Sequence, residues 1–439
     1  MKKNDKSTIR AWAMFDWSNS AYNLVITSTI FPAYYTAITT SQDKGDVVGF
    51  FGFQFINTAL ANYSLAFAYL VMALVLPILS AIADNRGNKK SFMKGFTYMG
   101  SFACIGLFFF KIETLEWGII CSTLAAMGYI GGVLFNNSYL PEIASIDEQD
   151  RVSAQGFAYG YIGSVLLQII CFVFVLKPEW FGIQDATFAP RLSFLLVGLW
   201  WMGFSQIPFK KLPSGKANAK PSKHNVFKSG FTELRSVWTK ISRLSSLKRF
   251  LGAFFFYAMG VQTTMLVAAA FGEKILRLGA SKLIVTILII QLVAILGAFL
   301  MSALAKRMGN IQVLLIVVLL WIIVCVSAYV IQTEMQFYML AALVGLIMGG
   351  IQSLSRSTYS KLIPADETDT TAFFSFYDVT EKLAIVVGLF FFAFIEEQTK
   401  NIRYSALSLA LFFAIGLFFL IRLLRQHNKE KGSLNSYVG

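Results

Sequence analysis

The sequence predicts an all-α integral membrane protein with twelve transmembrane helices in two pseudo-symmetric six-helix halves. The prediction rests on an apolar composition, on twelve apolar runs of membrane-spanning length and on an internal repeat. Of the 439 residues, 56% are hydrophobic and only 14% are charged, and the mean hydropathy is +0.61. Ordinary soluble proteins are about 45–50% apolar and about 25% charged. The composition therefore excludes an ordinary soluble protein.

Twelve runs are long enough to cross a bilayer, whose hydrocarbon core needs about 20 apolar residues in a helix. The first six cover 12–38, 57–82, 91–110, 116–138, 153–176 and 191–208. The second six cover 248–272, 282–304, 311–331, 336–358, 371–395 and 403–424. The polar stretch KKLPSGKANAKPSKHN separates the two sets. The predicted domains are a six-helix bundle at 1–208, a basic cytoplasmic linker at 209–247, a second bundle at 248–425 and a disordered cytoplasmic tail at 426–439.

The distribution of basic residues predicts the orientation. Most of the 38 lysines and arginines lie at the N-terminus, in the linker, in the C-terminal tail and in every second loop. We therefore expect a multi-pass protein of the inner (cell) membrane. Because cytoplasmic loops carry an excess of Lys and Arg, both termini and the linker are expected on the cytoplasmic side. The net charge of +14 then reflects topology and attraction to anionic membrane lipid. The sequence has no separate basic domain of the kind that binds nucleic acid, so we expect no nucleic-acid partner.

The sequence shows no signature of a metal site, a cofactor or an enzyme. The four cysteines lie inside apolar runs without metal-ligand spacing, and the two histidines lie in polar segments. No GxxxxGK[ST], HExxH or nucleophile-elbow motif is present. We therefore expect no disulfide, no metal, no cofactor and no enzymatic activity.

An internal repeat supports the two-half arrangement. The stretch SAIADNRGNKK from Ser80 and the stretch SALAKRMGN from Ser302 share a frame about 220 residues apart. Glycine pairs and one tyrosine recur at nearly the same spacing: Gly128 and Gly132 with Gly345 and Gly349, and Tyr139 with Tyr359. Parallel repeats of this kind are typical of transporters built from two six-helix halves.

Several stretches resemble a known family: WAMFDWSNSAY, AIADNRGNKK, NNSYLPEIA and SAQGFAYGYIGS in the first half, and YAMGVQT, GGIQSLSRSTYSKLIP and FFSFYDVTEK in the second. On these motifs the chain resembles a bacterial member of the major facilitator superfamily (MFS), within the autophagy-related, Atg22-like vacuole-effluxer family. The chain departs from the family pattern where Ala258 and Met259 replace an Asn-Asp pair, and where Glu381 replaces a small residue.

The resemblance implies a secondary active transporter that works by alternating access. It implies efflux or uptake of a small polar solute such as an amino acid, and a monomer as the oligomeric state. Since no ATP-binding motif is present, the energy is expected from a solute or ion gradient, most simply that of protons.

Charged and polar residues within the apolar runs predict the substrate and ion pathway. A rise of about 1.5 Å per residue puts Asp378 roughly 10 Å and Lys382 roughly 16 Å into the eleventh run, with Glu381 adjacent. A charge at that depth costs at least about 2.5–3.5 kcal/mol and is expected to face a partner or a wet cavity. A structural ion pair is the alternative. The remaining pathway candidates are Gln262 in the seventh run and the polar stripe of Asp16, Asn19 and Asn23 in the first.

A second group of residues predicts a cytoplasmic gate. Asp84 and Arg86 follow the second run, and Glu142 follows the fourth at the same membrane surface. We expect these three to form a latch that closes the cytoplasmic side, or else a solvated loop that only sets topology. Arg356, near the end of the tenth run, is either a boundary residue that snorkels to the interface or a residue with a role in gating or substrate contact.

Two other functions fit the same membrane architecture. The chain is alternatively a lipid flippase or scramblase whose charged eleventh helix forms a headgroup groove. A non-transporting membrane scaffold or receptor acting through its basic linker is the third possibility. Transport of labelled amino acids or of labelled lipids in proteoliposomes discriminates the first two, and trimming the linker tests the third.

Overall fold

The computed structural model describes residues 3–40, 45–185, 187–214 and 226–436. Backbone contacts divide the chain into two compact units. The N-terminal unit comprises Asp5–Tyr139 and Tyr159–Phe227, and the C-terminal unit comprises Leu140–Ala158 and Lys228–Gly439 together with Asn4. The division differs from the predicted domains, because Leu140–Ala158 belongs to the C-terminal unit.

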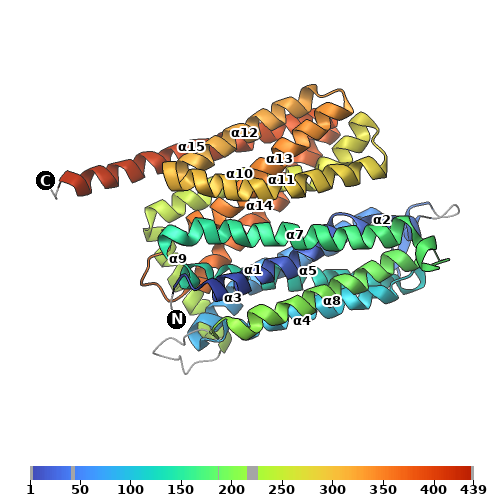
Figure 1. The fold of residues 1–439 in the computed structure, drawn as a ribbon, viewed down its shortest axis with the longest axis horizontal. Helices are drawn as coiled ribbons and strands as arrows, with labels where there is room; N and C mark the ends of the chain where they lie inside the picture. The colour runs from blue at the N-terminus through green and yellow to red at the C-terminus, as the bar shows by residue number, and fades with distance from the viewer. Residues whose placement is uncertain (1–2, 41–44, 186, 215–225, 437–439) are drawn as a thin grey trace. The chain divides into compact units, whose positions relative to one another are not determined.

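The N-terminal unit is a bundle of helices joined by short turns (Figure 1). Its long elements are α1 (Lys6–Ala21), the π-helix η1 (Tyr22–Thr27), α2 (Ile30–Thr39), α3 (Asn57–Arg86), α4 (Lys89–Gly106), α5 (Leu115–Asn137), the later part of α7 (Gln149–Leu176) and α8 (Phe188–Lys211). Its short 3-10 turns are η2 (Leu107–Phe109), η3 (Ile112–Thr114) and η5 (Pro178–Phe181).

The C-terminal unit is also helical (Figure 1). Its most extensive helix–helix contacts are those of α11 with α13 and of α10 with α15. Its elements are α6 (Leu140–Ile143), η4 (Ile146–Glu148), the first residues of α7, α9 (Val226–Arg243), α10 (Ser245–Leu276), α11 (Ala280–Met308), α12 (Asn310–Val330), α13 (Glu334–Leu362), α14 (Thr370–Thr399) and α15 (Ile402–Ser436).

Helical segments lie at all twelve predicted spans, but only ten of the described helices are long and apolar enough to cross a membrane by those criteria. The first predicted span is divided between α1, η1 and α2, so that α1 is only 16 residues long. The eleventh is α14, which carries charged side chains both in its middle and near its end. The count of twelve membrane crossings is therefore not confirmed, and the two exceptions are the helices with most of the candidate pathway residues.

A small β-hairpin departs from the all-helical prediction. Strand β1 (Val47–Phe50) pairs antiparallel with β2 (Phe53–Ile56), with Phe50 opposite Phe53. The two turn residues have positive φ, 46° at Phe51 and 83° at Gly52. Two-residue hairpin turns with positive φ match the right-handed twist of the strands. The aromatic-rich, β-prone sequence VVGFFGFQF therefore forms a hairpin in the loop before α3.

The linker and the tail contain more helix than the sequence suggested. Helix α9 lies inside the predicted linker at 209–247, of which residues 215–225 lie outside the described part. Helix α15 continues to Ser436, well past the predicted span end at 424 and into the residues expected to be a disordered tail. Arg, Gln, Lys and Glu are good helix formers, so a polar stretch after an apolar span extends the same helix.

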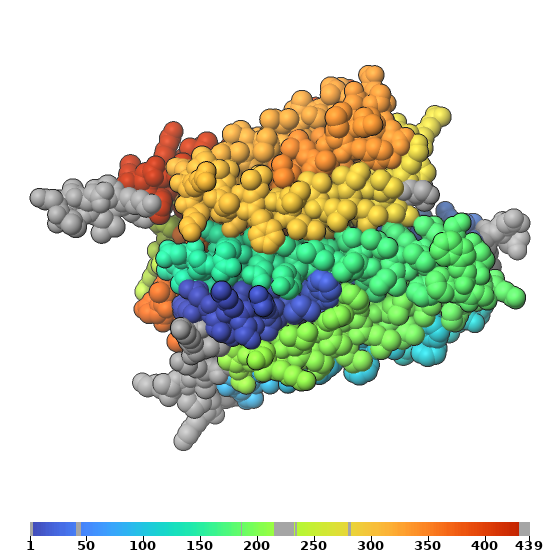
Figure 2. Space-filling model, in the orientation of Figure 1, coloured from blue at the N-terminus to red at the C-terminus, as the bar shows by residue number. Residues whose placement is uncertain are grey.

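The surface and the packing are those of a membrane protein. Large apolar side chains on the spans are exposed in both units, among them Phe67 and Leu74 of α3 and Leu296 of α11. Figure 2 shows one face of this surface. Helices pack closely at glycines, because a Cβ on Gly128 would lie 2.5 Å from the Cα of Gly100.

Candidate functional site

The strongest candidate site is a buried charged cluster on α14. Asp378 and Lys382 are only 5% and 8% exposed. Lys382 Nζ lies 3.2 Å from Asp378 Oδ1 and 2.9 Å from Glu381 Oε2. The i, i+4 spacing puts Asp378 and Lys382 on one helix face, as the sequence predicted. One ammonium group therefore interacts with two carboxylates.

A neighbouring helix completes the cluster. Gln262 of α10 donates a hydrogen bond from Nε2 to Glu381 Oε1 at 2.8 Å. The two helices approach closely nearby, since a Cβ on Gly388 of α14 would lie 2.4 Å from Thr263 Oγ1 and 2.8 Å from the carbonyl oxygen of Met259. The structure thus brings together the four predicted pathway residues of the second half, which are Gln262, Asp378, Glu381 and Lys382.

The cluster has unused hydrogen-bonding capacity. Within the described residues, Asp378 Oδ2 and Thr263 Oγ1 are buried without a hydrogen-bond partner. With all groups ionised, two carboxylates against one ammonium leave one excess negative charge. Buried charges are normally paired and hydrogen-bonded, because leaving a buried acceptor unsatisfied is costly. The cluster is thus suited to accept a proton or a cationic group at Asp378.

Aromatic side chains adjoin the cluster one turn nearer the start of α14. Tyr377 stacks on Phe254 of α10 with a centroid distance of 4.2 Å and an interplanar angle of 14°. Tyr359 of α13 lies 5.0 Å from Tyr377 by ring centroids. These ring contacts pack α10, α13 and α14 together next to the charged cluster.

In the N-terminal unit, α1 carries a buried polar pair. Asp16 and Asn19 are 7% and 1% exposed. Asn136 of α5 donates from Nδ2 to Asp16 Oδ1 at 3.2 Å, and the backbone carbonyl oxygen of Asn136 accepts a hydrogen bond from Trp12 Nε1 at 2.8 Å. Asn19 Nδ2 has no hydrogen-bond partner within the described residues. Asp16 is therefore hydrogen-bonded to α5, and Asn19 keeps one amide donor available.

Asn23 departs from the predicted polar stripe. The stripe assumed a continuous α-helix, but the π-helix η1 starts at Tyr22. A π-helix closes i→i+5 rather than i→i+4 hydrogen bonds and so changes the phase of the following side chains. Asn23 is exposed whereas Asp16 and Asn19 are buried, and the three do not form one uniform face.

The predicted latch residues lie in two different units. Asp84 is buried and Arg86 is exposed at the end of α3, where Gly87 adopts φ 64° and ends the helix. Glu142 belongs to the C-terminal unit, and its Oε1 accepts a hydrogen bond from Thr370 Oγ1 of α14 at 3.1 Å. A latch of Asp84, Arg86 and Glu142 remains a prediction.

Arg356 is buried rather than extended toward an interface. It is 3% exposed, and its Nε and Nη2 donate to Ser153 Oγ and to the Ser153 carbonyl oxygen at 3.0 and 2.8 Å. Its guanidinium lies 4.2 Å from the ring centre of Phe157. The interpretation as a snorkelling residue is therefore wrong: Arg356 fastens the first turns of α7 to α13.

An adjacent ion pair was missed by the sequence analysis. Lys361 Nζ lies 2.5 Å from Asp150 Oδ2, and Asn310 Nδ2 donates to Asp150 Oδ1 at 2.6 Å. Asp150 opens α7, Lys361 ends α13 and Asn310 opens α12. The internal repeat singled out one of these three residues, because Asn310 occupies the position of Asn88 in the shared frame. Nothing in the sequence indicated that Asp150 would reach across to it.

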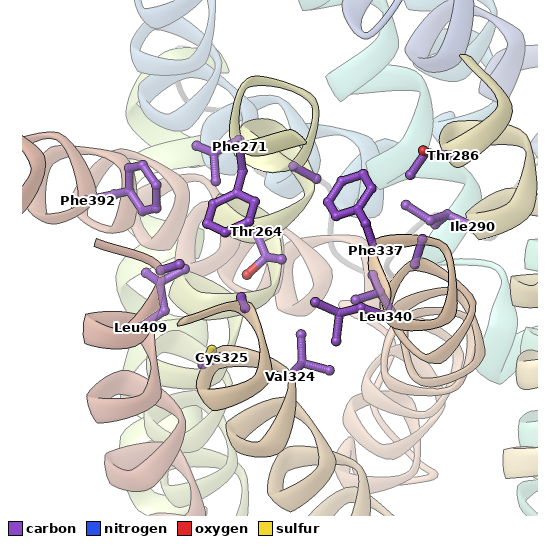
Figure 3. Close-up of a pocket in the computed structure, with 16 residues that line it drawn as sticks. Thr264, Phe271, Thr286, Ile290, Val324, Cys325, Phe337, Leu340, Phe392 and Leu409 are labelled. Atoms are coloured by element: carbon purple, nitrogen blue, oxygen red, sulfur yellow. The ribbon is translucent and has the colours of Figure 1, made fainter. Parts of the chain in front are cut away.

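A separate cavity of about 60 Å³ lies in the C-terminal unit, between the last turns of α10 and α12 and the first turns of α11 and α13. Figure 3 shows the rings of Phe271 and Phe337 pointing into it, beside Val324 and Leu340. Thr264, two residues after Gln262, donates its hydroxyl to the Gly260 carbonyl oxygen and leaves the lining apolar. Among the described residues, no three His, Cys, Asp or Glu side chains gather in a way that could hold a metal ion.

Comparison with known proteins identifies the family. Residues 4–433 match the family described as "Vacuole effluxer Atg22 like". The chain belongs to this family. The uncharacterized MFS-type transporter YxiO of Bacillus subtilis strain 168 is 32% identical over 421 residues, which cover 96% of this chain and 95% of YxiO. Autophagy-related protein 22 of Kluyveromyces lactis is 24% identical over 94% of this chain and 92% of its own length.

Solved structures show the same fold for this Atg22-like protein. The Escherichia coli fucose:proton symporter FucP has a TM-score of 0.70 at 13% identity and covers 94% of this chain and 98% of its own. The human organic anion transporter MFSD10 has a TM-score of 0.72 at 10% identity and covers 95% of this chain and 100% of its own. The predicted MFS fold is confirmed, and the protein is a multi-pass membrane transporter of a small-molecule substrate.

Proposed function

We propose that this Atg22-like protein is a proton-coupled secondary transporter of a small polar solute with a cationic group, such as an amino acid, that works by alternating access. The buried cluster on α14 carries the proposal: Asp378 and Glu381 share the ammonium of Lys382, and Asp378 Oδ2 has no hydrogen-bond partner within the described residues. The family description "vacuole effluxer" and the fucose:proton symporter of the same fold support solute transport and proton use.

The chemistry of the cluster suggests how coupling works. One excess negative charge in a low-dielectric site is unfavourable, and either a proton or the ammonium group of a solute compensates it. A solute ammonium that binds Asp378 Oδ2 would displace the proton held there, so that loading the solute and releasing the proton become linked. Lys382 keeps the two carboxylates in place throughout, and Gln262 orients Glu381.

The remaining predicted residues take supporting roles in the proposal. Asp16, Asn19 and Asn23 provide polar groups along the first span, and Asn19 contributes an available amide donor. Asp84, Arg86, Glu142 and Arg356 belong to the cytoplasmic gate. The proposal places both termini in the cytoplasm, as the distribution of basic residues predicts.

Counterflow in proteoliposomes tests this function. The purified protein is reconstituted, an internal pH dye reports protons, and a panel of labelled amino acids is offered with labelled phospholipid as the alternative cargo. We expect solute-dependent proton movement, lost in Asp378→Asn and retained in Lys306→Gln, an exposed basic residue at the end of α11. Movement of labelled lipid without movement of any solute would establish the flippase instead.

A further inference from the structure

Four basic side chains gather where α10 begins and α15 leaves its apolar stretch. Lys248 and Arg249 lie in the first turns of α10, and Arg422 and Arg425 lie on α15, which packs along α10. All four are exposed. We call these four residues the basic cluster.

Hydrogen bonds fix the geometry of the basic cluster. Arg249 Nη1 donates to Gln426 Oε1 at 2.6 Å, and Gln426 Nε2 also bonds to Ser245 Oγ. Gln426 lies four residues after Arg422 and therefore on the same helix face. The guanidinium of Arg422 is packed 4.5 Å from the ring centre of Phe418. The group of α15 that accepts the hydrogen bond from Arg249 is thus a neutral amide, not a carboxylate.

Among the side chains that the structure describes, which on α15 end at Lys429, no acidic group compensates the cluster. Lys240, by contrast, interacts with both Glu367 and Asp369 at 2.8 Å, whereas none of the four members forms an ion pair there. Like charges three residues apart on a helix, as at Arg422 and Arg425, destabilise it. An anion from outside the chain would remove this repulsion.

The surroundings favour a lipid over a soluble anion. Along α15, Phe418 follows Leu411 by seven residues and Arg422 follows Phe418 by four, so the three share one side of the helix. All three are exposed. The same side is thus apolar along the span and becomes basic where the span ends. Lys and Arg at that depth meet phospholipid headgroups. Figure 1 shows α15 continuing beyond the neighbouring helices of its unit after this point.

We propose that the basic cluster of Lys248, Arg249, Arg422 and Arg425 binds the phosphate headgroup of an anionic phospholipid whose acyl chains lie against Phe418 and Leu411. The lipid links the start of α10 to α15 and stabilises the C-terminal unit. The site does not depend on which solute the protein carries.

Thermal unfolding of the purified full-length protein in a non-ionic detergent tests the site. Phosphatidylglycerol, phosphatidylcholine and inorganic phosphate are titrated separately, because a ligand of the folded state raises the unfolding temperature by mass action. We expect phosphatidylglycerol to stabilise the protein where phosphatidylcholine and phosphate do not. Higher ionic strength is expected to weaken the effect.

Variants separate the cluster from general lipid effects. Each basic residue near an anionic surface is worth roughly fivefold in affinity, so Arg422→Gln/Arg425→Gln should need about 25-fold more phosphatidylglycerol for the same stabilisation. Arg422→Lys/Arg425→Lys keeps the charges and should respond like the parent. The matched control is Arg277→Gln/Lys400→Gln, which removes two exposed basic residues at the far ends of α10 and α14.

Three results would overturn the proposal. The first is an unchanged phosphatidylglycerol response in Arg422→Gln/Arg425→Gln. The second is an equal loss in the control variant. The third is stabilisation by inorganic phosphate as strong as that by phosphatidylglycerol, which would make the cluster a soluble-anion site.

Discussion

Replacing Lys382 by methionine is the most direct test of the charged cluster. The change keeps an unbranched side chain of similar length and removes the ammonium group that lies 3.2 Å from Asp378 Oδ1 and 2.9 Å from Glu381 Oε2. The side chains of Lys382 and Asp378 are 10% and 7% exposed, so solvent screens the pair little. Removing one partner of a buried ion pair costs about 3–5 kcal/mol, because the other charge is left uncompensated.

The magnitude converts to a measurable change in unfolding temperature. For a folding unit of roughly 150–250 residues, each kcal/mol lowers the midpoint by about 2–4 °C, which gives about 6–20 °C for Lys382→Met. Thermal unfolding in detergent measures it, and proteoliposome transport should be lost in the same variant. Asp378→Asn/Lys382→Met removes both members of the pair and should unfold at a higher temperature than Lys382→Met alone.

Lys306→Met is the matched control, since Lys306 is exposed in the same unit. A shift for Lys382→Met no larger than for Lys306→Met would refute the reasoning that the ammonium holds two buried carboxylates. A double variant less stable than Lys382→Met would refute the assignment of Asp378 as its partner.

Three further predictions concern other parts of the chain. Asp150→Asn removes the ion pair with Lys361 and should weaken the attachment of the first turns of α7 by about 1.5–3 kcal/mol, seen as faster hydrogen exchange there. Gly388→Val should cost about 1–3 kcal/mol or more and reduce transport, because a Cβ would lie 2.4 Å from Thr263 Oγ1. The hydrogen bonds that cap α1 lower the pKa of Asp5, so their contribution is present above the unfolded pKa and is lost as the pH falls through the folded one, as amide exchange in the first turn should show.

Each of these predictions has its own control. Asp147→Asn, at an exposed acid just before α7, should leave exchange unchanged. Gly252→Val lies on α10, where the nearest atom to a Cβ is 3.8 Å away, and should be tolerated. Asp5→Asn should abolish the pH dependence of the first turn. If a control variant had the same effect as its test variant, the proposed cause would be refuted. That cause is the carboxylate of Asp150 or Asp5 for the exchange experiments and close packing for Gly388→Val.

The sequence predicted the helical segments because apolar length and charge distribution are local properties. It also predicted the α14 cluster, since Asp378 and Lys382 are four residues apart and any helix brings them together. Gln262 was predicted only through its motif, and its contact with Glu381 depends on how α10 packs against α14. Asn23 departs from the predicted stripe because the π-helix η1 follows α1, and no residue pattern indicated a π-helix.

The contacts of Arg356 and Asp150 could not be predicted from the sequence. Arg356 looked like a boundary residue because it ends a span, yet tertiary packing buries it against Ser153. More than half of the sequence of the C-terminal unit lies between Asp150 and Lys361, and the two residues share no motif. Contacts of this kind depend on side-chain packing between helices, and a single sequence does not contain that information.

The division of α7 has a mechanical consequence. Residues up to Ala158 belong to the C-terminal unit and residues from Tyr159 belong to the N-terminal unit, although the helix is unbroken. Any rearrangement between the units must either bend this rod near Ala158, between Gly156 and Gly160, or detach its first turns from α13.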